Sequence, residues 1–492
     1  MNKKLIYLTM LCSIVFLGCN EDFLEGENTS VLTDVGISDN SDAYPQLIDG
    51  SLNGINSLVI DDRSFTTRHY DFGQKGIDIW TDIVSGDMAL SGSAYGWYDD
   101  IANLVSTTDY ADDINDITWQ YYYKIISIAN TVIESSGGND ATPTSDEAKR
   151  ILGQAKFYRA YGYFHLLQMY QRSYDPNQEV LPFYNLDVFS LSKVEASVIY
   201  AQVVDDLNST ITLLDGYTRV GKDKVDKTVA HGYLAYTYAA MGNYSDAKVQ
   251  ADAVISAGYP LTTAGQLAYP GAGSGFNDFT TDSWIWGYDL TEDLGHQLID
   301  WWGQIDAYTY SYAWAGDYKS IDDLLYSKIP SSDIRKSQFG TATADLQPIN
   351  KFFDPGRTIG GQYIITTDLI LMRVEEFYLL SAEAAAKTGD EAGAKARLAQ
   401  LLDIRMGATE AAARLAPLSG QALINEVYLQ TRIELWGEGK TYFALKRNQA
   451  SVTRGTNHVF RAGETFSYDS DEMSFLIPQS EIDNNPGITD QN

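Results

Sequence analysis

The sequence predicts a mainly α-helical protein, built as a scaffold of antiparallel helix pairs with one loop-rich, aromatic-rich subdomain. Seven long segments carry apolar residues at the three- and four-residue spacing of a buried helix face. Most of these segments are neighbours along the chain, so we expect them to pack in pairs. Between about residues 259 and 367 the helical spacing gives way to glycine, aromatic and polar residues. The predicted helical segments are about 42–58, 115–135, 146–171, 192–215, 226–257, 368–405 and 419–447.

The first residues have the pattern of a secretory signal. Lysines at positions 3 and 4 precede an apolar run from Leu5 to Leu17, which is shorter than the roughly 20 residues that cross a bilayer. The run ends in Phe16-Leu17-Gly18-Cys19, which resembles a bacterial lipobox, although leucine is the usual residue at the place of Phe16. We predict a lipoprotein signal peptide over residues 1–18 and lipidation of Cys19. Plain secretion with an unmodified thiol is the alternative.

Residues 19–41 are predicted to be a lipidated tether, and residues 42–492 the helical domain. Glu21 and Asp22 lie directly behind Cys19, and acidic residues there resemble the surface-export signal of such lipoproteins. We therefore expect attachment to the outer membrane, facing the cell exterior. The one other cysteine, Cys12, would be removed with the signal peptide, so the mature chain can form no disulfide.

The composition narrows the class of ligand. The formal net charge is −31, and the acidic residues are spread along the chain. Such a surface repels nucleic acid and anionic lipid, so we expect no nucleic-acid partner. The chain also carries 34 Tyr and 9 Trp, which is enough to fill a core and still leave rings for a binding face.

Two of the helix pairs have a visible turn. Gly242 precedes Ala247 by five residues, and Gly389 precedes Ala394 by the same offset. This is the spacing of a tetratricopeptide helix-turn-helix, in which glycine makes the turn and alanine lies where the helices cross. The pattern predicts a tetratricopeptide-like scaffold.

Patterns for catalysis are weak. Adjacent carboxylates on a helix do not face each other, so acidic doublets do not by themselves form the carboxylate pair of a glycosidase. The glycine-rich stretch 216–222 is followed by Asp223, where a phosphate loop needs Ser or Thr. The five histidines are far apart, and we expect no metal, no cofactor and no catalytic residue. The acidic doublets are Asp112-Asp113, Asp205-Asp206, Asp322-Asp323 and Glu375-Glu376.

Patterns for binding are stronger. One aromatic cluster contains Trp80, Tyr95, Trp97 and Tyr98, and a second lies between residues 301 and 314. Flat rings stack on the apolar faces of sugars, and nearby polar side chains can satisfy sugar hydroxyls. The alternative is that these rings belong to the core. The candidate ligand-binding residues are Arg68, Asp71, Asp78, Trp97, Tyr98, Trp301, Trp302, Tyr308, Tyr310 and Trp314.

Several segments resemble the SusD/RagB family, in the order in which that family carries them. One contains Trp119-Gln-Tyr-Tyr122, and another contains Arg373 before an alanine-rich helix. A third ends the chain with Phe475-Leu-Ile477-Pro478 followed by an Asn-rich stretch. The matching segments are 119–130, 153–168, 371–384, 432–447 and 475–492.

The resemblance implies a tetratricopeptide-like scaffold, an outer-membrane lipid anchor and a role as lid over a SusC-like TonB-dependent β-barrel transporter. It also implies capture of oligosaccharide or polysaccharide for import, or of peptide in some members. No residues match a defined starch site, so the ligand itself is not carried over. The alternatives are capture of peptide on the same scaffold, a surface glycoside hydrolase, and a structural interaction module built on helical repeats.

Overall fold

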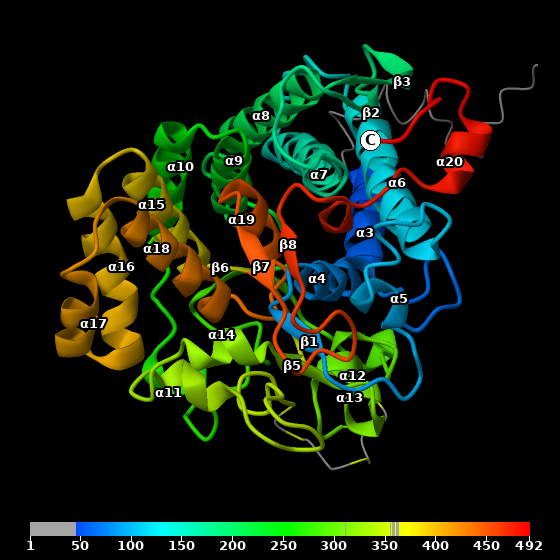
Figure 1. The fold of residues 1–492 in the computed structure, drawn as a ribbon. Helices are drawn as coiled ribbons and strands as arrows, with labels where there is room; N and C mark the ends of the chain where they lie inside the picture. Colours follow the sequence, from blue (N-terminus) through cyan, green and yellow to red (C-terminus); the bar gives the residue numbers. More distant parts are fainter. Residues whose placement is uncertain (1–45, 310, 355, 357–359, 361–363) are drawn as a thin grey trace, which may run out of the picture.

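The computed structural model describes residues 46–309, 311–354, 356, 360 and 364–492. The predicted signal peptide, Cys19, the tether and Tyr310 lie outside the described residues. Paired helices form an arch from α6 through α7, α8 and α9 to α15 and α18, and the loop-rich segment lies below them (Figure 1). The mainly helical fold class is therefore confirmed.

The first half of the arch surrounds one central helix, α7 (Asp146–Tyr170), which packs between α6 (Asp113–Ser135) and α8 (Ala196–Leu213). Helix α3 (Gln46–Ile60) packs against both α6 and α7. The helix starts follow from side-chain caps, which satisfy backbone N–H groups that have no partner within the helix. Asp112 caps α6 and Ser145 caps α7 in this way.

The second half contains the two predicted helix-turn-helix pairs. Helix α9 (Lys227–Ala240) turns into α10 (Tyr244–Ser256), and α15 (Glu375–Lys387) turns into α16 (Glu391–Met406). Gly242 and Gly389 make these turns with φ of +74° and +87°, a conformation that glycine adopts without steric cost. Ala247 and Ala394 are fully buried where the helices cross. The pairs join because α10 packs against α15.

The C-terminal helices close the arch. Helix α18 (Gly420–Glu434) packs on α15, and α19 (Thr441–Arg447) packs on α9. The sequence predicts one helix over about 419–447, but the chain breaks between α18 and α19, where Gly437 and Gly439 have positive φ. The other helices of this region are α17 (Ala408–Leu415) and α20 (Gln479–Asn484).

The described strands form four antiparallel pairs, none of which the helical spacing predicts. Strand β6 (Leu369–Arg373) corrects the predicted helix start at residue 368, because a short buried apolar run has no period that separates strand from helix. Strand β3 (Phe189–Glu195) likewise replaces the predicted start at 192. The pairs are β1 (Met88–Leu90) with β5 (Lys319–Ile321), β2 (Glu179–Tyr184) with β3, β4 (Trp284–Tyr288) with β6, and β7 (Ser451–Thr453) with β8 (Thr465–Ser467).

In its described part, the predicted loop-rich segment contains strands β4 and β5, and its helices are all short. Two further helices precede α6, and one of them, α4 (Gly73–Val84), is buried on every side. Its Lys75 and Asp78 pair inside the protein, so α4 lacks the polar face that a prediction from spacing requires. The short elements are α5 (Asp99–Ala102), α11 (Ala264–Leu267), α12 (Trp301–Ile305), α13 (Tyr312–Ala315), α14 (Asp323–Ser327), and 3₁₀ turns at Glu292–Leu294, Ile334–Gln338 and Asp471–Met473.

Buried ion pairs tie the arch to the loop-rich segment. The carboxylate of Glu434 at the end of α18 lies 3.0 Å from Arg335, 2.8 Å from Arg373 and 2.6 Å from Arg405. All four side chains are at most 1% exposed. Removing one partner from such a group leaves an uncompensated buried charge, which costs about 3–5 kcal/mol. The network therefore fixes how α16, α18 and β6 meet.

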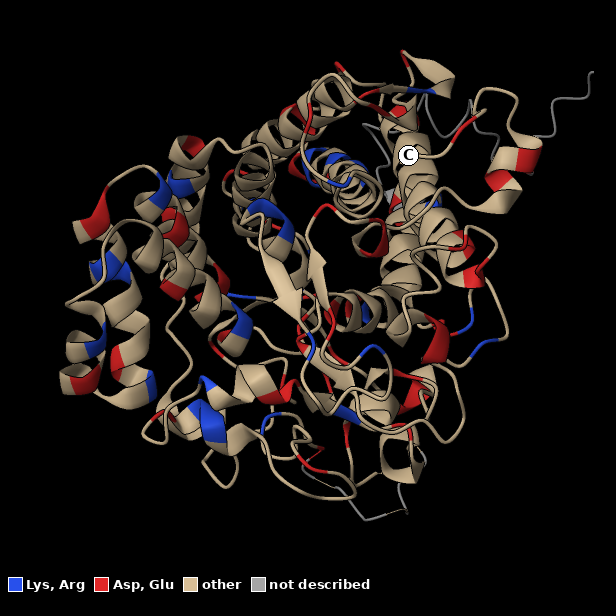
Figure 2. Ribbon diagram, in the orientation of Figure 1, with Lys and Arg blue, Asp and Glu red and all other residues tan. Residues whose placement is uncertain are grey.

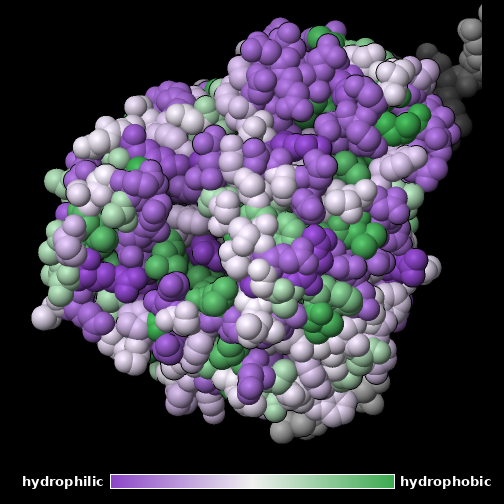
Figure 3. Space-filling view, in the orientation of Figure 1, coloured by the Kyte–Doolittle hydropathy of each residue, from purple (hydrophilic) through white to green (hydrophobic). Residues whose placement is uncertain are grey.

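The surface carries mixed charges with an acidic excess. Asp and Glu occur on elements across the whole ribbon rather than in one segment (Figure 2). Hydrophilic residues dominate the top of the molecule, and apolar residues form separate small patches elsewhere on the same face (Figure 3). Across the described ranges, no helix combines the length and apolarity that a membrane span requires.

Candidate functional site

Three segments that are distant in the sequence bring four rings together. The imidazole of His69 stacks on the indole of Trp97, with centroids 4.6 Å apart and planes inclined by 22°. Tyr312, at the start of α13, lies edge-on to Trp97 at 6.3 Å and to Tyr95 at 5.1 Å. We call these four residues, His69, Tyr95, Trp97 and Tyr312, the aromatic platform.

The members of the aromatic platform differ in exposure. Tyr95 is 57% exposed, whereas His69 and Trp97 are half-buried and Tyr312 is only 7% exposed. Tyr312 therefore supports the other rings from the protein side, and Tyr95 and Trp97 present ring surface to solvent. Arg68, next to His69, is exposed and forms an ion pair with Asp113 at 2.8 Å.

Buried polar contacts hold the aromatic platform from below. The Asp317 carboxylate accepts hydrogen bonds from the backbone N–H groups of Ala94 and Tyr95, at 2.8 and 2.9 Å. Lys319 donates to the Gln304 side chain at 2.7 Å, and the Gln304 amide donates to the backbone carbonyl of His69 at 3.2 Å. Both segments that carry the rings are thus held by residues at or next to strand β5, directly by Asp317 and through Gln304 by Lys319. This arrangement favours a rigid face.

The electrostatics keep the stacked rings neutral. Burial, together with the charge of Arg63, lowers the pKa of His69 below its ordinary value, so the ring carries no charge at pH 7. Its Nδ1 is in hydrogen-bonding contact with the Tyr312 hydroxyl. Beneath the platform, burial lowers the pKa of Lys319 to about 7. An uncharged, rigid aromatic face suits a neutral ligand with an apolar side.

Two predicted polar contacts are structural. Asp71 is 1% exposed and accepts hydrogen bonds from the backbone N–H groups of Phe65 and Thr66. Asp78 is 3% exposed and pairs with Lys75 at 2.8 Å. Neither carboxylate reaches the surface, so the prediction that they contact ligand is corrected: they shape the loop before α4 and the interior of α4.

Three predicted aromatic contacts also belong to the core. Trp301 and Trp302 are 2% and 0% exposed, and Trp301 packs edge-on against Trp302 and Phe352. Tyr98 is 1% exposed, with the Lys319 ammonium 3.9 Å from its ring centroid. The sequence shows that rings gather here, but it does not show which side of a short helix faces inward.

The remaining predicted contacts keep their place near the surface. Trp97 belongs to the aromatic platform, and Tyr308 and Trp314 are half-buried on either side of Tyr312 in the sequence. His69 is not among the predicted ligand contacts, because the five histidines are far apart in the sequence and form no motif. Its position next to Arg68 is the signal that could have identified it. Among the residues the structure describes, no group of three or more His, Cys, Asp or Glu is arranged to hold a metal ion.

Most members of the acidic doublets have structural partners. Asp112 caps α6, and Asp113 binds Arg68. Asp206 forms a fully buried ion pair with Arg159, and Asp322 caps α14. The carboxylates of the fourth doublet are also buried, paired with Arg405 and Tyr236. These contacts explain the doublets without catalysis.

Two family models match the chain. The SusD family model matches residues 304–492. A second model, described as starch-binding associating with outer membrane, matches residues 61–238. The second match contains His69, Tyr95 and Trp97, and the first contains Tyr312, so each match carries one part of the aromatic platform.

Solved structures share the fold over most of the chain. A SusD-like carbohydrate binding protein from Bacteroides vulgatus is 24% identical, with a TM-score of 0.74 over 90% of this chain and 97% of that one. A SusD superfamily protein from Bacteroides thetaiotaomicron is 21% identical, with a TM-score of 0.72 over 91% and 99%. Surface glycan-binding protein A from Bacteroides uniformis is 17% identical, with a TM-score of 0.63 over 91% and 99%.

A curated relative matches part of the chain. It is a SusD-like protein from Formosa agariphila, 22% identical over 291 residues. The matched region is 56% of this chain and 50% of that relative, so the chain spans about half the length of this relative.

Proposed function

Because this chain belongs to the SusD/RagB family, we propose a function in glycan capture. In this proposal the protein lies at the cell surface and captures oligosaccharide on the aromatic platform. The observation that carries the proposal is the stack of His69 on Trp97 beside the exposed ring of Tyr95. The segment that carries Tyr95 and Trp97 and the segment that carries His69 are each held by hydrogen bonds from below, so the rings offer a neutral, preorganised surface. Preorganisation reduces the entropy lost on binding.

Recognition follows from the chemistry of the two partners. Pyranose rings have apolar C–H faces, which pack on the Tyr95 and Trp97 rings as water is displaced. Each such contact contributes on the order of 1 kcal/mol, which is about fivefold in affinity, so stacking must act together with hydrogen bonds. The exposed guanidinium of Arg68 donates hydrogen bonds to hydroxyls at the platform edge.

The names of similar proteins agree with this proposal. One family description is starch-binding associating with outer membrane. Two structural relatives are named as a carbohydrate binding protein and a surface glycan-binding protein. These names support a carbohydrate ligand and a location at the outer membrane.

The finer parts of the proposal concern attachment and delivery. Acylation of Cys19 anchors the protein to the outer membrane, and the acidic residues behind it direct it to the exterior. There it covers a SusC-like TonB-dependent barrel, which imports the captured glycan. The protein performs no chemistry, which is supported by the structural partners of its acidic doublets.

Affinity electrophoresis of the purified chain through native gels tests the ligand class. The gels contain a panel of neutral and acidic polysaccharides, with casein-derived peptides as the comparison in solution. We expect at least one polysaccharide to slow migration. Binding of peptides alone would replace glycan capture with peptide capture, and release of reducing sugar by the purified protein would replace it with hydrolysis.

A further inference from the structure

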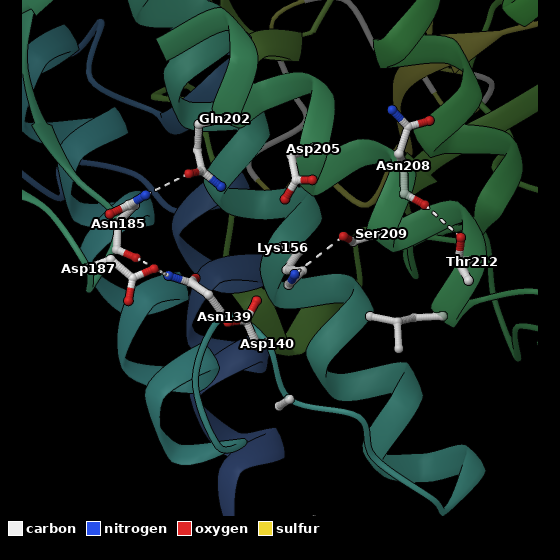
Figure 4. A pocket seen from close by; sticks show the side chains of 12 residues that line it. Asn139, Asp140, Lys156, Asn185, Asp187, Gln202, Asp205, Asn208, Ser209 and Thr212 are labelled. Carbon is white, nitrogen blue, oxygen red and sulfur yellow. Dashed lines mark hydrogen bonds between the residues drawn. The ribbon is translucent and has the colours of Figure 1, made fainter. Parts of the chain in front are cut away.

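A polar cavity of about 510 Å³ lies at the other end of the molecule from the aromatic platform. It opens beside α8 at the top of Figure 1, whereas α12 and α13 lie at the bottom. Its wall is formed by α7, α8, the loop after α6 and the turn between β2 and β3 (Figure 4). The lining residues are Asn139, Asp140, Ala141, Lys156, Asn185, Asp187, Gln202, Asp205, Asn208, Ser209, Thr212 and Leu213.

The α8 wall follows from helical spacing. Gln202, Asp205, Asn208 and Thr212 recur every three or four residues, which places them on one face of the helix. The opposite face packs against the protein through Ile199, Val203 and Leu207, which are fully buried. Asp205, Asn208 and Thr212 are exposed, and Figure 4 shows Gln202 and Asp205 on the side of the helix that faces Asn185 and Lys156.

The floor is formed by a largely buried lysine side chain. Lys156 on α7 is only 6% exposed. Among the described residues, its ammonium group donates one hydrogen bond, to the Ser209 hydroxyl at 3.3 Å. An ammonium group can donate three hydrogen bonds, so Lys156 has donors left for a ligand. Figure 4 shows its nitrogen between Asp205 and Ser209.

The rim is held by hydrogen bonds among its own amides. The Asn139 amide donates to the Asn185 carbonyl at 2.6 Å and to the Asp187 carboxylate at 2.5 Å. Asn185 donates to Gln202 at 2.7 Å, which joins the turn to α8. Arg159 also donates to the Asn185 carbonyl. The Asn139 side-chain oxygen is buried and accepts no hydrogen bond from any described residue.

We infer that this cavity is a second carbohydrate site, which binds a neutral mono- or disaccharide unit through hydrogen bonds without aromatic stacking. Amides and hydroxyls both donate and accept, as sugar hydroxyls do. The lining contains three aspartates against one lysine, so it disfavours uronic acids and other anions. Its volume falls within the range of about 300–1,000 Å³ that is typical of small-molecule sites.

The inference rests on the proposed function, because the second site would hold another part of the same glycan. Two separated sites on one protein raise the retention of a polymer that reaches both, since the second contact is made at high effective concentration. A short oligosaccharide that occupies only one site gains nothing from this. The cavity therefore contributes to the capture of polysaccharide more than to the capture of its fragments.

Saturation-transfer NMR of the full chain tests this site. The sugars are glucose, galactose, mannose, N-acetylglucosamine and galacturonate. Asn208→Trp fills the cavity from an exposed position, and Asn425→Trp makes the same exposed change on α18. Trp97→Ala removes the platform ring. In the Trp97→Ala background we expect at least one neutral sugar to keep its signal, and Asn208→Trp to reduce that signal at least about threefold, with Asn425→Trp without effect.

Asp205→Ala, also at an exposed position, provides a second test that does not add bulk, and we expect it to weaken the same signal. An unchanged signal in both Asn208→Trp and Asp205→Ala would overturn the second site. Loss of every sugar signal in Trp97→Ala alone would also overturn it, while leaving glycan capture by the aromatic platform intact. A strong galacturonate signal at the cavity would contradict the assignment of a neutral ligand.

Discussion

The imidazole of His69 lies against the indole of Trp97 at a centroid distance of 4.6 Å, although helix α4 and strand β1 separate the two residues in the sequence. Asp317 fixes the backbone before Trp97, and Gln304 fixes the backbone of His69. The loop-rich segment therefore acts as the support of the aromatic platform.

Asp317→Asn should weaken glycan binding without removing any ring. The neutral side chain accepts weaker hydrogen bonds from Ala94 and Tyr95, so the loop that carries Tyr95 becomes less ordered. We expect an affinity loss of about 3–10-fold, measured by calorimetry. Asp109→Asn, which likewise replaces a charged acceptor of a backbone N–H by a neutral one, is the control. Equal affinity of Asp317→Asn and the native protein would show that the platform does not need this support.

Lys319→Met should alter the dependence of stability on pH. Burial lowers the pKa of Lys319 to about 7, whereas an unfolded lysine titrates near 10.4. Between these values the unfolded state binds more protons, so the contribution of this group to the unfolding free energy rises with pH. The native protein should gain roughly 2 kcal/mol from this group between pH 7 and 9, and Lys319→Met should lack that gain.

Chemical denaturation at pH 6, 7 and 9 measures this difference. Comparing the variant with the native protein isolates Lys319 from other titrating groups, including Lys446, whose pKa burial also lowers to about 7. Parallel curves of unfolding free energy against pH for the two proteins would contradict the prediction.

Glu438→Gln should destabilise the protein at neutral pH and lose its effect in acid. Burial alone would raise the pKa of Glu438, but Arg373 and Lys351 outweigh it and lower the value to about 2. This lowered pKa contributes stability that is fully present above about pH 4.3 and is lost as the pH falls towards 2. We expect a loss of about 3 kcal/mol at pH 7 in urea denaturation.

The matched control is Glu134→Gln, at an exposed position of α6. It should leave the unfolding free energy within about 0.5 kcal/mol of the native value. If Glu438→Gln were as stable as the native protein at pH 7, the network around Glu434 and Glu438 would not hold the arch to the loop-rich segment.

Gly242→Ala and Gly389→Ala should each destabilise the protein, although no atom lies within 4 Å of the added methyl. The cost comes from the backbone, because both positions have positive φ and an L residue pays about 1–2 kcal/mol there. Gly54→Ala, inside α3 and also in open space, should instead stabilise by up to about 1 kcal/mol. Thermal unfolding compares the three, and a shift of the same sign in all would contradict this explanation.

The arch could be predicted from sequence because its signals are local. Apolar spacing located α6, α7 and α8, and the glycine and alanine offsets located both helix-turn-helix pairs. Helix α4 is not predicted because its charged residues are all buried, and β6 is not predicted because five buried residues have no distinctive period. Two of the strand pairs, β1 with β5 and β4 with β6, join segments far apart in the sequence, which local patterns do not reveal.

Clustering of aromatic residues in the sequence leads to the region that contains the aromatic platform, and Trp97 and Arg68 lie near the surface. That these two residues contact ligand stays a prediction. The orientation of each ring depends on tertiary packing, so Trp301 and Trp302 were wrongly assigned to a ligand-facing surface. The polar cavity beside α8 was not predicted, because its residues come from four segments and include only ordinary polar side chains.

Calorimetric titration tests the central claim most directly. The native protein and Trp97→Ala are each titrated with an oligosaccharide of the glycan that slows the native protein in gels. Trp97 is half-buried, so thermal unfolding of the variant serves as the check that its fold is retained. We predict a loss of affinity of about tenfold or more in a folded variant. Unchanged affinity in Trp97→Ala would contradict glycan capture on the aromatic platform.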